Sequence, residues 1–204
     1  MASETDIANY ALTMIGNNPI TSLAETNKPA VLCALHYPLA RDTTLAAHPW
    51  NFAIKRVLLA KETTVPTHEF TAQHAIPADC LRVLRTGFEA NGTPVEYRIE
   101  GNKVLCDEDA VYIEYISNDV PTGRFSPLFI DAVSAKLAAA IAIPITGSDT
   151  KAQAMAQLYT GKLQEARTVD AQEGTPRDIV DTSGWFSARG GFTGYGGFRG
   201  YGIE

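Results

Sequence analysis

The chain has 204 residues and an apolar fraction of 45%, values ordinary for a folded globular protein that can bury a core. Its 17 basic and 23 acidic residues give a net charge of −6, which argues against a protein whose main task is to grip phosphate. The cysteines Cys33, Cys80 and Cys106 form no CxxC pair and stand far from the histidines, which argues against a disulfide framework and a zinc site. We expect them to be buried structural thiols.

Targeting signals are weak. The longest apolar run, over residues 137–145, contains Pro144 and is far shorter than the roughly 20 residues that cross a bilayer. The N-terminal stretch MASETDIANY lacks the basic and apolar regions of a signal peptide. We therefore expect no membrane-spanning helix, no membrane contact, and a protein that stays in the cytosol where it is synthesised.

The first predicted helix begins with a capping motif. Asp6 follows Ser3 at the spacing of a capping box, in which the two residues satisfy each other's backbone donors. Apolar residues then recur at helical spacing up to residue 15, and Gly16 can take the C′ position. We predict a helix between Ser3 and Gly16, followed by a loop over residues 17–26.

A second helix is predicted to begin near Asn27 and to end near His48-Pro49. Pro38 should kink it, because proline removes one hydrogen-bond donor and clashes with the carbonyl group of the preceding turn, at Ala34. The apolar residues along this helix are Val31, Leu32, Leu35, Leu39 and Leu45.

From residue 55 to residue 117 the apolar period changes from 3.6 to 2. Strict alternation over 95–100 runs into Gly101-Asn102 and returns through 104–106, which predicts a β-hairpin. Residues 111–116 predict another strand, and 81–84 and 55–59 are further candidates. We expect a small antiparallel sheet.

Two more helices are predicted after the sheet. Ser126 is an N-cap before Pro127, and the apolar stripe that follows should end at Pro144. Ser148 opens the last helix, which should stop before Gly174. The predicted fold is α+β: a bundle of about four helices (1–54 and 121–174), an inserted β-rich domain (55–120), and an extended C-terminal arm rich in glycine and aromatic residues (175–204).

Catalytic and metal-binding patterns are missing. The serine motif G-x-S-x-G is absent, so His36, His48, His68 and His74 are considered singly. His48 should cap the chain or pack against the ring of Trp50. His68 and His74 share a face without a third ligand, and the acidic run 107–109 lacks the glycine of a calcium loop and fits a solvated turn. We predict no enzyme, no cofactor and no metal site.

The stretch GWFSARGGFTGYGGFRGYGIE at the end of the chain (residues 184–204) raises the question of what covers its rings. Four of them recur every third residue, the period of a polyproline II helix. We expect this arm to become extended on a partner, with its first two rings as the anchor. The predicted partner-binding residues are Trp185, Phe186, Arg189, Phe192, Tyr195, Phe198, Arg199 and Tyr201.

A series of residues in a defined order also carries a family resemblance. It comprises Ile7, Ala8, Ala11, Leu12, Ile15, Gly16, Pro19, Ile20, Ser22 and Leu23, then Tyr37, Arg41 and Leu45, then the run His48-Pro49-Trp50-Asn51-Phe52-Ala53. It continues through residues 77–82, Tyr115-Ile116, 125–142, Tyr159 and Glu165-Ala166. In this order the residues resemble the tail tubular protein A family of short-tailed bacteriophages, and HPWNFA is the most specific piece.

The resemblance implies a structural virion protein. Members of that family are head-to-tail adaptors, which form a ring, commonly of twelve copies, between the portal protein and the tail or nozzle proteins. The implied location is the head-tail junction of the virion, with genomic DNA passing through the lumen. An acidic subunit should repel this DNA rather than bind it specifically.

Other interpretations of the sequence remain open. His48, Pro49, Trp50 and Phe52 are predicted as a hydrophobic hinge between the second helix and the sheet, with direct partner contact as the alternative. A tail-associated cell-wall hydrolase would need a carboxylate pair in a groove. An RNA-binding protein would use the Arg-Gly pairs of the arm, as RGG segments do.

Overall fold

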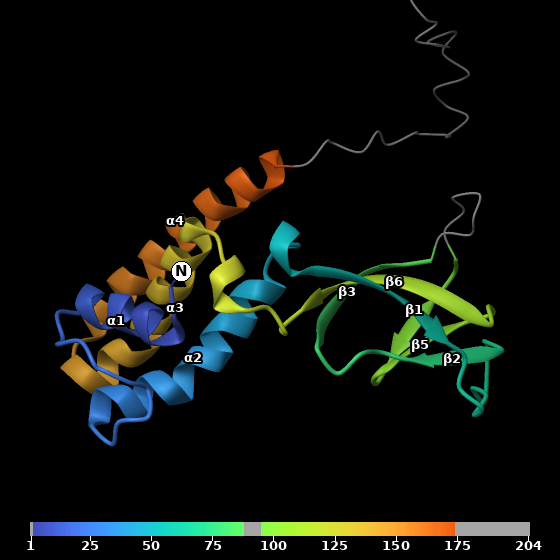
Figure 1. Cartoon of the computed structure of the whole chain (residues 1–204), viewed down its shortest axis with the longest axis horizontal. Helices are drawn as coiled ribbons and strands as arrows, with labels where there is room; N and C mark the ends of the chain where they lie inside the picture. The colour runs from blue at the N-terminus through green and yellow to red at the C-terminus, as the bar shows by residue number, and fades with distance from the viewer. Residues whose placement is uncertain (1, 88–94, 174–204) are drawn as a thin grey trace, which may run out of the picture. The chain divides into compact units, whose positions relative to one another are not determined.

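The computed structural model describes residues 2–87 and 95–173 of the chain, in which two α-helices precede a β-rich segment in the sequence and two follow it (Figure 1). The helices are α1 (Glu4–Met14), α2 (Lys28–Ala46), α3 (Pro127–Thr146) and α4 (Asp149–Gln172). The strands are β1 (Ile54–Ala60), β2 (Ala72–Ala75), β3 (Cys80–Thr86), β4 (Arg98–Glu100), β5 (Lys103–Cys106) and β6 (Ala110–Ser117). Short 3₁₀ turns, η1 (Asn51–Ala53) and η2 (Thr122–Arg124), precede β1 and α3. The predicted α+β class is confirmed.

Each helix begins directly after the residue that the sequence predicted as its N-cap. The Ser3 hydroxyl accepts the N–H of Asp6 at 3.1 Å, and the Asp6 carboxylate accepts the N–H of Ser3 at 2.8 Å, which completes the capping box. This backbone hydrogen bond from Ser3 lowers the pKa of Asp6. The side chains of Asn27, Ser126 and Ser148 likewise accept an N–H in the first turn of α2, α3 and α4.

Prolines stand inside two helices without ending them. α2 continues through Pro38, and α3 runs two residues beyond Pro144, where the sequence prediction had ended it. α3 stops instead at Gly147, whose φ of +68° is left-handed and whose N–H bonds to the carbonyl oxygen of Ile143 at 2.8 Å. A proline in the last turn removes only one hydrogen bond, so the C-cap glycine decides where the helix ends.

The predicted sheet is divided into two antiparallel three-stranded sheets. One has the order β1-β6-β3, with β1 and β6 paired from Ile54↔Ile116 to Ala60↔Ala110. The other has the order β2-β5-β4. The predicted hairpin turn is confirmed at Gly101, where φ is +57°, but its first strand is shorter than expected and begins at Arg98. The sequence did not predict β2, whose Ala-Gln-His-Ala composition has little β propensity.

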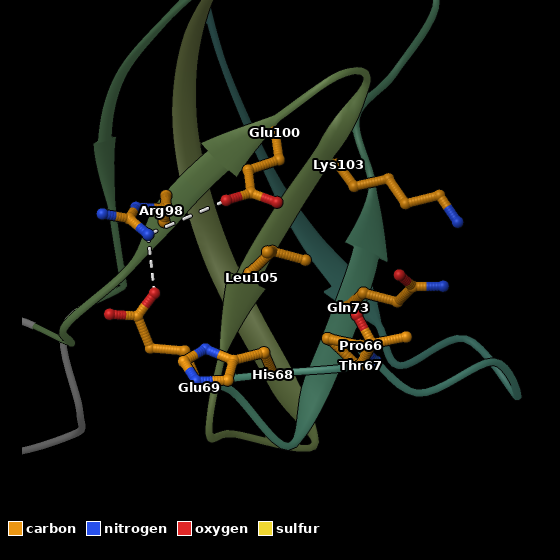
Figure 2. Close-up of a pocket in the computed structure, with 9 residues that line it drawn as sticks. All are labelled: Pro66, Thr67, His68, Glu69, Gln73, Arg98, Glu100, Lys103 and Leu105. Atoms are coloured by element: carbon orange, nitrogen blue, oxygen red, sulfur yellow. Dashed lines mark hydrogen bonds and ion pairs between the residues drawn. The ribbon is translucent and has the colours of Figure 1, made fainter.

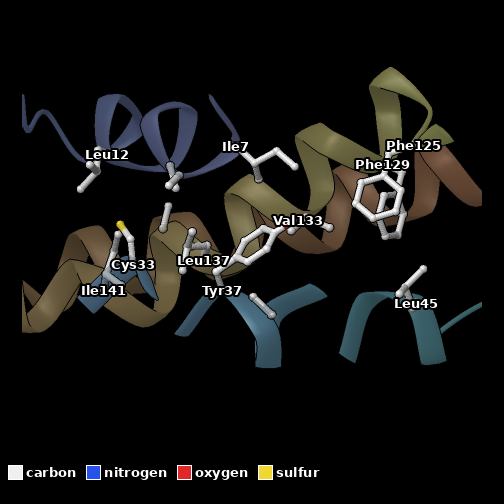
Figure 3. Close-up of a cluster of buried hydrophobic side chains, with 14 of the residues drawn as sticks. Ile7, Leu12, Cys33, Tyr37, Leu45, Phe125, Phe129, Val133, Leu137 and Ile141 are labelled. Atoms are coloured by element: carbon white, nitrogen blue, oxygen red, sulfur yellow. The ribbon is translucent and has the colours of Figure 1, made fainter. Parts of the chain in front are cut away.

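A hydrophobic core joins all four helices (Figure 3). Ile7 and Leu12 from α1, Tyr37 and Leu45 from α2, and four residues of α3 are among its buried members. Trp50, in the link between α2 and β1, and Ile116 of β6 also belong to this core. Helices that precede the insertion and helices that follow it thus share one core.

A second core lies between the sheets. Val111, Ile113 and Tyr115 from β6 pack with Val104 and Cys106 from β5. Cys33 in the helical core is also fully buried, and burial raises the pKa of its thiol to about 11. The prediction of buried thiols is confirmed for these two cysteines, whereas Cys80 is half-buried.

One described helix, α3, is long and apolar enough to cross a membrane by length and composition alone, which the sequence prediction missed. Half of this stretch is buried, and α3 contacts α1, α2 and α4 (Figure 1). Its residues Phe129, Val133, Leu137 and Ile141 lie fully inside the helical core. A helix enclosed by a bundle needs the same apolar composition as a spanning helix.

Candidate functional site

Residues 48–52, which carry the most specific part of the resemblance, lead from the end of α2 into β1. Trp50 is their centre and is 0% exposed. Its indole N–H donates to the carbonyl oxygen of Thr44 at 2.9 Å, which satisfies the one polar atom of the ring and folds the chain back onto the last turn of α2. Pro49 beside it remains exposed.

The aromatic rings of this segment pack on each other and on α3. The Trp50 ring lies 4.9 Å from His48, 5.9 Å from Phe52 and 5.0 Å from Phe129, measured between ring centroids. Phe125, just before α3, lies 4.8 Å from Phe129 (Figure 3). Most of these pairs are edge-to-face or tilted, the arrangement that favours aromatic contacts. The prediction that His48 packs against the Trp50 ring is confirmed.

The last turn of α4 is attached to the same segment by Asp170. Its carboxylate accepts the backbone N–H of Asn51 at 3.2 and 3.3 Å and lies 3.2 Å from Nε2 of His48. The side-chain amide of Asn51 donates to the carbonyl oxygen of Asp170 at 2.8 Å, and Arg167 donates to that of Ala47 at 2.8 Å. We name this group of contacts the Asp170 junction.

The ionisable groups of the Asp170 junction are held in a partly desolvated setting. Burial raises the pKa of the Asp170 carboxyl, against the opposite effect of the Asn51 N–H and of His48. Burial lowers the pKa of the His48 imidazole and outweighs the pull of the Asp170 charge. In the Asp170 junction, burial therefore disfavours the charged forms of both the Asp170 carboxyl and the His48 imidazole.

A histidine held by an aspartate is also the base-and-orienter pair of hydrolytic triads. Such a triad needs a nucleophile within hydrogen-bond reach of the histidine. In the described part of the chain, the imidazole of His48 lies against the Asp170 carboxylate and packs edge-on against the Trp50 ring. The contacts of His48 thus favour a packing role.

A pocket of about 340 Å³ adjoins the Asp170 junction. Phe52, Leu128 and Val169 give it an apolar wall, and Asp170 and Arg124 add polar groups. It lies between the end of α4 and the start of α3, so a partner bound here would contact the segment of the resemblance directly.

A second pocket, of about 400 Å³, lies on the β4-β5 hairpin (Figure 2). Arg98 ion-pairs with Glu69 at 2.6 Å and with Glu100 at 3.9 Å, so one guanidinium stands between two carboxylates. Glu69 has a φ of +73°, unlike any other non-glycine residue that the structure describes. Two carboxylates, those of Glu69 and Glu100, therefore line this polar pocket, and both are engaged by Arg98.

The predicted histidine pair is not brought together. His68 lines the pocket of Figure 2, whereas His74 is fully buried and its Nε2 lies 3.0 Å from the carbonyl oxygen of Glu108. No three His, Cys, Asp or Glu side chains in the described part of the chain are grouped to hold a metal. Residues 107–109 lie exposed between β5 and β6, as predicted for a solvated turn.

The sequence predicted some residues of the candidate site and missed others. Asn51, Arg167 and Asp170 were not predicted as a group, because no local pattern links positions so far apart. The eight predicted partner-binding residues of the arm lie outside the described residues. These are Trp185, Phe186, Arg189, Phe192, Tyr195, Phe198, Arg199 and Tyr201.

The fold and the junction define an α+β protein in which a helical bundle carries two small inserted sheets. No protein-family model matches the chain, and no curated protein shows significant similarity to it.

Proposed function

We propose that this chain is a structural virion protein, a head-to-tail adaptor that forms a ring between the portal and the tail or nozzle proteins. The ring holds about twelve copies, if it follows the family that the sequence resembles. It sits at the head-tail junction of the virion and acts without catalysis or cofactor. DNA passes through its lumen without specific binding.

This proposal is supported mainly by the position of the residues that resemble the phage family, because many of them meet in one core. Many apolar residues of the resemblance, from the four helices, the HPWNFA run and β6, are buried together in the helical core, whereas Pro49 and Asn51 are exposed and Tyr115 belongs to the second core. The residues buried in the helical core include Ile7, Leu12, Ile15, Ile20, Tyr37, Leu45, Trp50, Ala53, Ile116, Phe125 and Ala166. Residues that are far apart in sequence and resemble one family therefore form one connected structural unit.

Two polar members of the resemblance also contact each other. The hydroxyl group of Tyr115 donates to the Asp79 carboxylate, which also accepts from Ser117 at 2.7 Å and from Lys55 at 2.8 Å. Burial opposes the charge of Asp79, yet these donors lower its pKa overall. This network fixes the start of β3 against the end of β6, so the resemblance extends beyond the helical core.

The test is electron microscopy of the purified protein mixed with the portal protein of the same phage. We expect rings seated on the portal. We expect the protein alone to be monomeric or weakly associated, because ordering an arm costs about 1–2 kcal/mol per residue. Failure to bind the portal at micromolar concentration would contradict the proposal.

Two further measurements separate the alternatives. A zymogram would reveal a cell-wall hydrolase, and loss of clearance in Glu69→Gln or Glu100→Gln would locate its site in the pocket of Figure 2. Salt-sensitive retention on RNA or duplex DNA would indicate a nucleic-acid-binding protein. We expect neither result.

A further inference from the structure

The outer face of α2 is apolar and exposed. Val31, Leu35 and Leu39 are 50%, 69% and 69% exposed, and Ala34 and Pro38 lie exposed beside them. Residues 29–40 contain no Asp, Glu, Lys or Arg. We call these five side chains the α2 face. Surface helices normally turn charged residues to solvent, and a contiguous apolar patch marks an interaction site.

The α2 face borders a groove that α2 forms with α3. The groove has a volume of about 180 Å³, and its lining includes Leu39 from α2 and Ala140 from α3. Ile143, one turn further along α3, is 51% exposed. The exposed apolar surface therefore reaches the neighbouring helix, although His36, Thr43 and Lys136 also line the groove.

The outer face of α4 has a different character. Ala154, Leu158 and Gly161 lie exposed at helical spacing, and residues 152–161 carry no formal charge. We call these three residues the α4 face. A Cβ atom added at Gly161 would meet no atom within 4 Å, so packing inside the chain does not require a glycine there. Glycine weakens a helix interior, and one use that offsets this is close approach of another backbone.

The two faces flank α3 at the same level. Lys136 of α3 lines the groove beside Leu39, and its Nζ lies 4.7 Å from the ring centroid of Tyr159 on α4. Leu158, next to Tyr159, belongs to the α4 face. A neighbouring copy placed beside the first without a shift along the helices would therefore bring an α2 face to an α4 face.

We propose that the α2 face of one copy packs on the α4 face of the next. The occupant is a second copy because the chain itself carries both surfaces: large aliphatic side chains (Val31, Leu35 and Leu39) on one, and on the other the small residues Ala154 and Gly161, which leave room for them on either side of Leu158. Neither the five residues of the α2 face nor the three of the α4 face include a charged side chain, and the Lys136 side chain lies in the adjoining groove. Since the two faces differ, the contact is heterologous and can repeat from copy to copy. The inference rests on the proposed function and specifies its ring contact.

Cysteine cross-linking of the full chain tests this contact. In a Cys80→Ser background, Leu35→Cys combined with Ala154→Cys should give a ladder of dimers, trimers and larger species under mild oxidation at high concentration. Each single variant should stay monomeric, and a mixture of the two should stop at the dimer. A folded double variant without a ladder, or dimers from Leu35→Cys alone, would overturn the proposal.

A second variant tests the role of Gly161. Gly161→Leu should keep the circular dichroism of the parent and at least its thermal stability, since a Cβ atom there meets no other atom within 4 Å and leucine favours a helix interior more than glycine does. Its self-association, followed by sedimentation velocity, should weaken by about tenfold or more, because the approach to Leu35 and Leu39 is blocked. Ala171→Leu, also exposed on α4 but outside the α4 face, is the matched control and should leave association unchanged. Unchanged association in Gly161→Leu would overturn the contact.

The outcomes also separate this contact from the proposed function. Rings on the portal that tolerate Gly161→Leu would leave the adaptor function standing and refute the contact. A cross-linking ladder from a protein that ignores the portal would support the contact and refute the adaptor function. If Leu35→Glu weakened portal binding and left self-association intact, the α2 face would take the portal instead, and the proposal would fail.

Discussion

The carboxylate of Asp170 accepts the backbone N–H of Asn51, although 119 positions separate the two residues in the sequence. The bond holds the last turn of α4 against the chain that leaves α2, and the same carboxylate meets His48. The segment with the strongest family resemblance is thus fixed by a residue that the resemblance does not include.

Replacing Asp170 tests how much this junction stabilises the fold. Asp170→Ala should lower the free energy of unfolding by about 1–2 kcal/mol, because the Asn51 N–H loses its acceptor while the cost of burying a carboxylate is relieved. Asp170→Asn keeps an acceptor oxygen and should lose less. Urea unfolding at pH 7 measures both. Asp131→Asn, which breaks a half-exposed ion pair with Lys162, is the control and should change stability by less than about 1 kcal/mol.

His48 should make stability depend on pH. Its pKa is lower in the folded protein than its ordinary value of 6.5, so the unfolded chain binds a proton more readily. Stability from this group is present above pH 6.5 and falls as the pH drops through the folded-state pKa. Urea midpoints between pH 8 and pH 5 should therefore decline less in His48→Gln than in the parent. An equal decline in both proteins would contradict this account.

Trp50 should be among the most costly residues to truncate. Trp50→Ala removes a fully buried ring and should destabilise the protein by about 3–5 kcal/mol. Trp50→Phe keeps much of the packing but loses the indole hydrogen bond to Thr44, at a cost of about 1–3 kcal/mol. Thermal unfolding followed by circular dichroism gives the order. Tyr10→Ala, at a ring that is 54% exposed, should have little effect.

Glu114 on β6 forms ion pairs with two arginines, one on each of the strands that flank β6 in its sheet. Its carboxylate binds Arg85 at 2.7 Å and Arg56 at 3.0 Å; burial works against its charge, yet these bonds lower its pKa below the ordinary 4.5. Glu114→Gln should cost about 1–3 kcal/mol at pH 7. The difference from the parent should shrink as the pH falls from 4.5 through the lowered folded-state pKa, because the parent carboxylate then takes up a proton. Glu100→Gln, at an exposed carboxylate, serves as the control in the same urea titrations.

Deletion of residues 184–204 tests the predicted docking arm, which lies outside the described residues. The truncated protein should keep its circular dichroism spectrum and melting temperature. Its affinity for the portal should fall severely, because its aromatic rings would no longer contribute buried area. Surface plasmon resonance on immobilised portal compares the two forms. Unchanged affinity would mean that another surface docks.

Local signals explain most of what the sequence predicted. Ser3, Asn27, Ser126 and Ser148 cap their helices through atoms three residues away, so a short stretch contains the whole interaction. The turn at Gly101 is equally local. The caps and turns of the fold were therefore accessible without any knowledge of packing.

Non-local packing explains the rest. The apolar residues noted on α2 include Val31, Leu35 and Leu39, yet the structure exposes all three and buries Ala30, Cys33, Tyr37, Ala40 and Thr44 instead. Which side of a helix faces the core depends on its neighbours, so small residues against α3 cannot be recognised by hydrophobicity alone. The strand β2 forms because it pairs with β5. Asp170 stabilises the link between α2 and β1 because the fold brings it within hydrogen-bond distance of Asn51.

The insertion of the sheets into the bundle has a consequence for how the protein is made. On the ribosome, α1 and α2 are synthesised well before α3. Their apolar faces therefore stay without their α3 partner while the whole β-rich segment is made. The second core draws only on residues 57–115 and can close during this interval. The helical core can be completed only after Leu163 and Ala166 of α4 have been synthesised, because both belong to it. During synthesis, α2 therefore exposes both its core-facing residues and the apolar outer face that remains exposed in the folded protein.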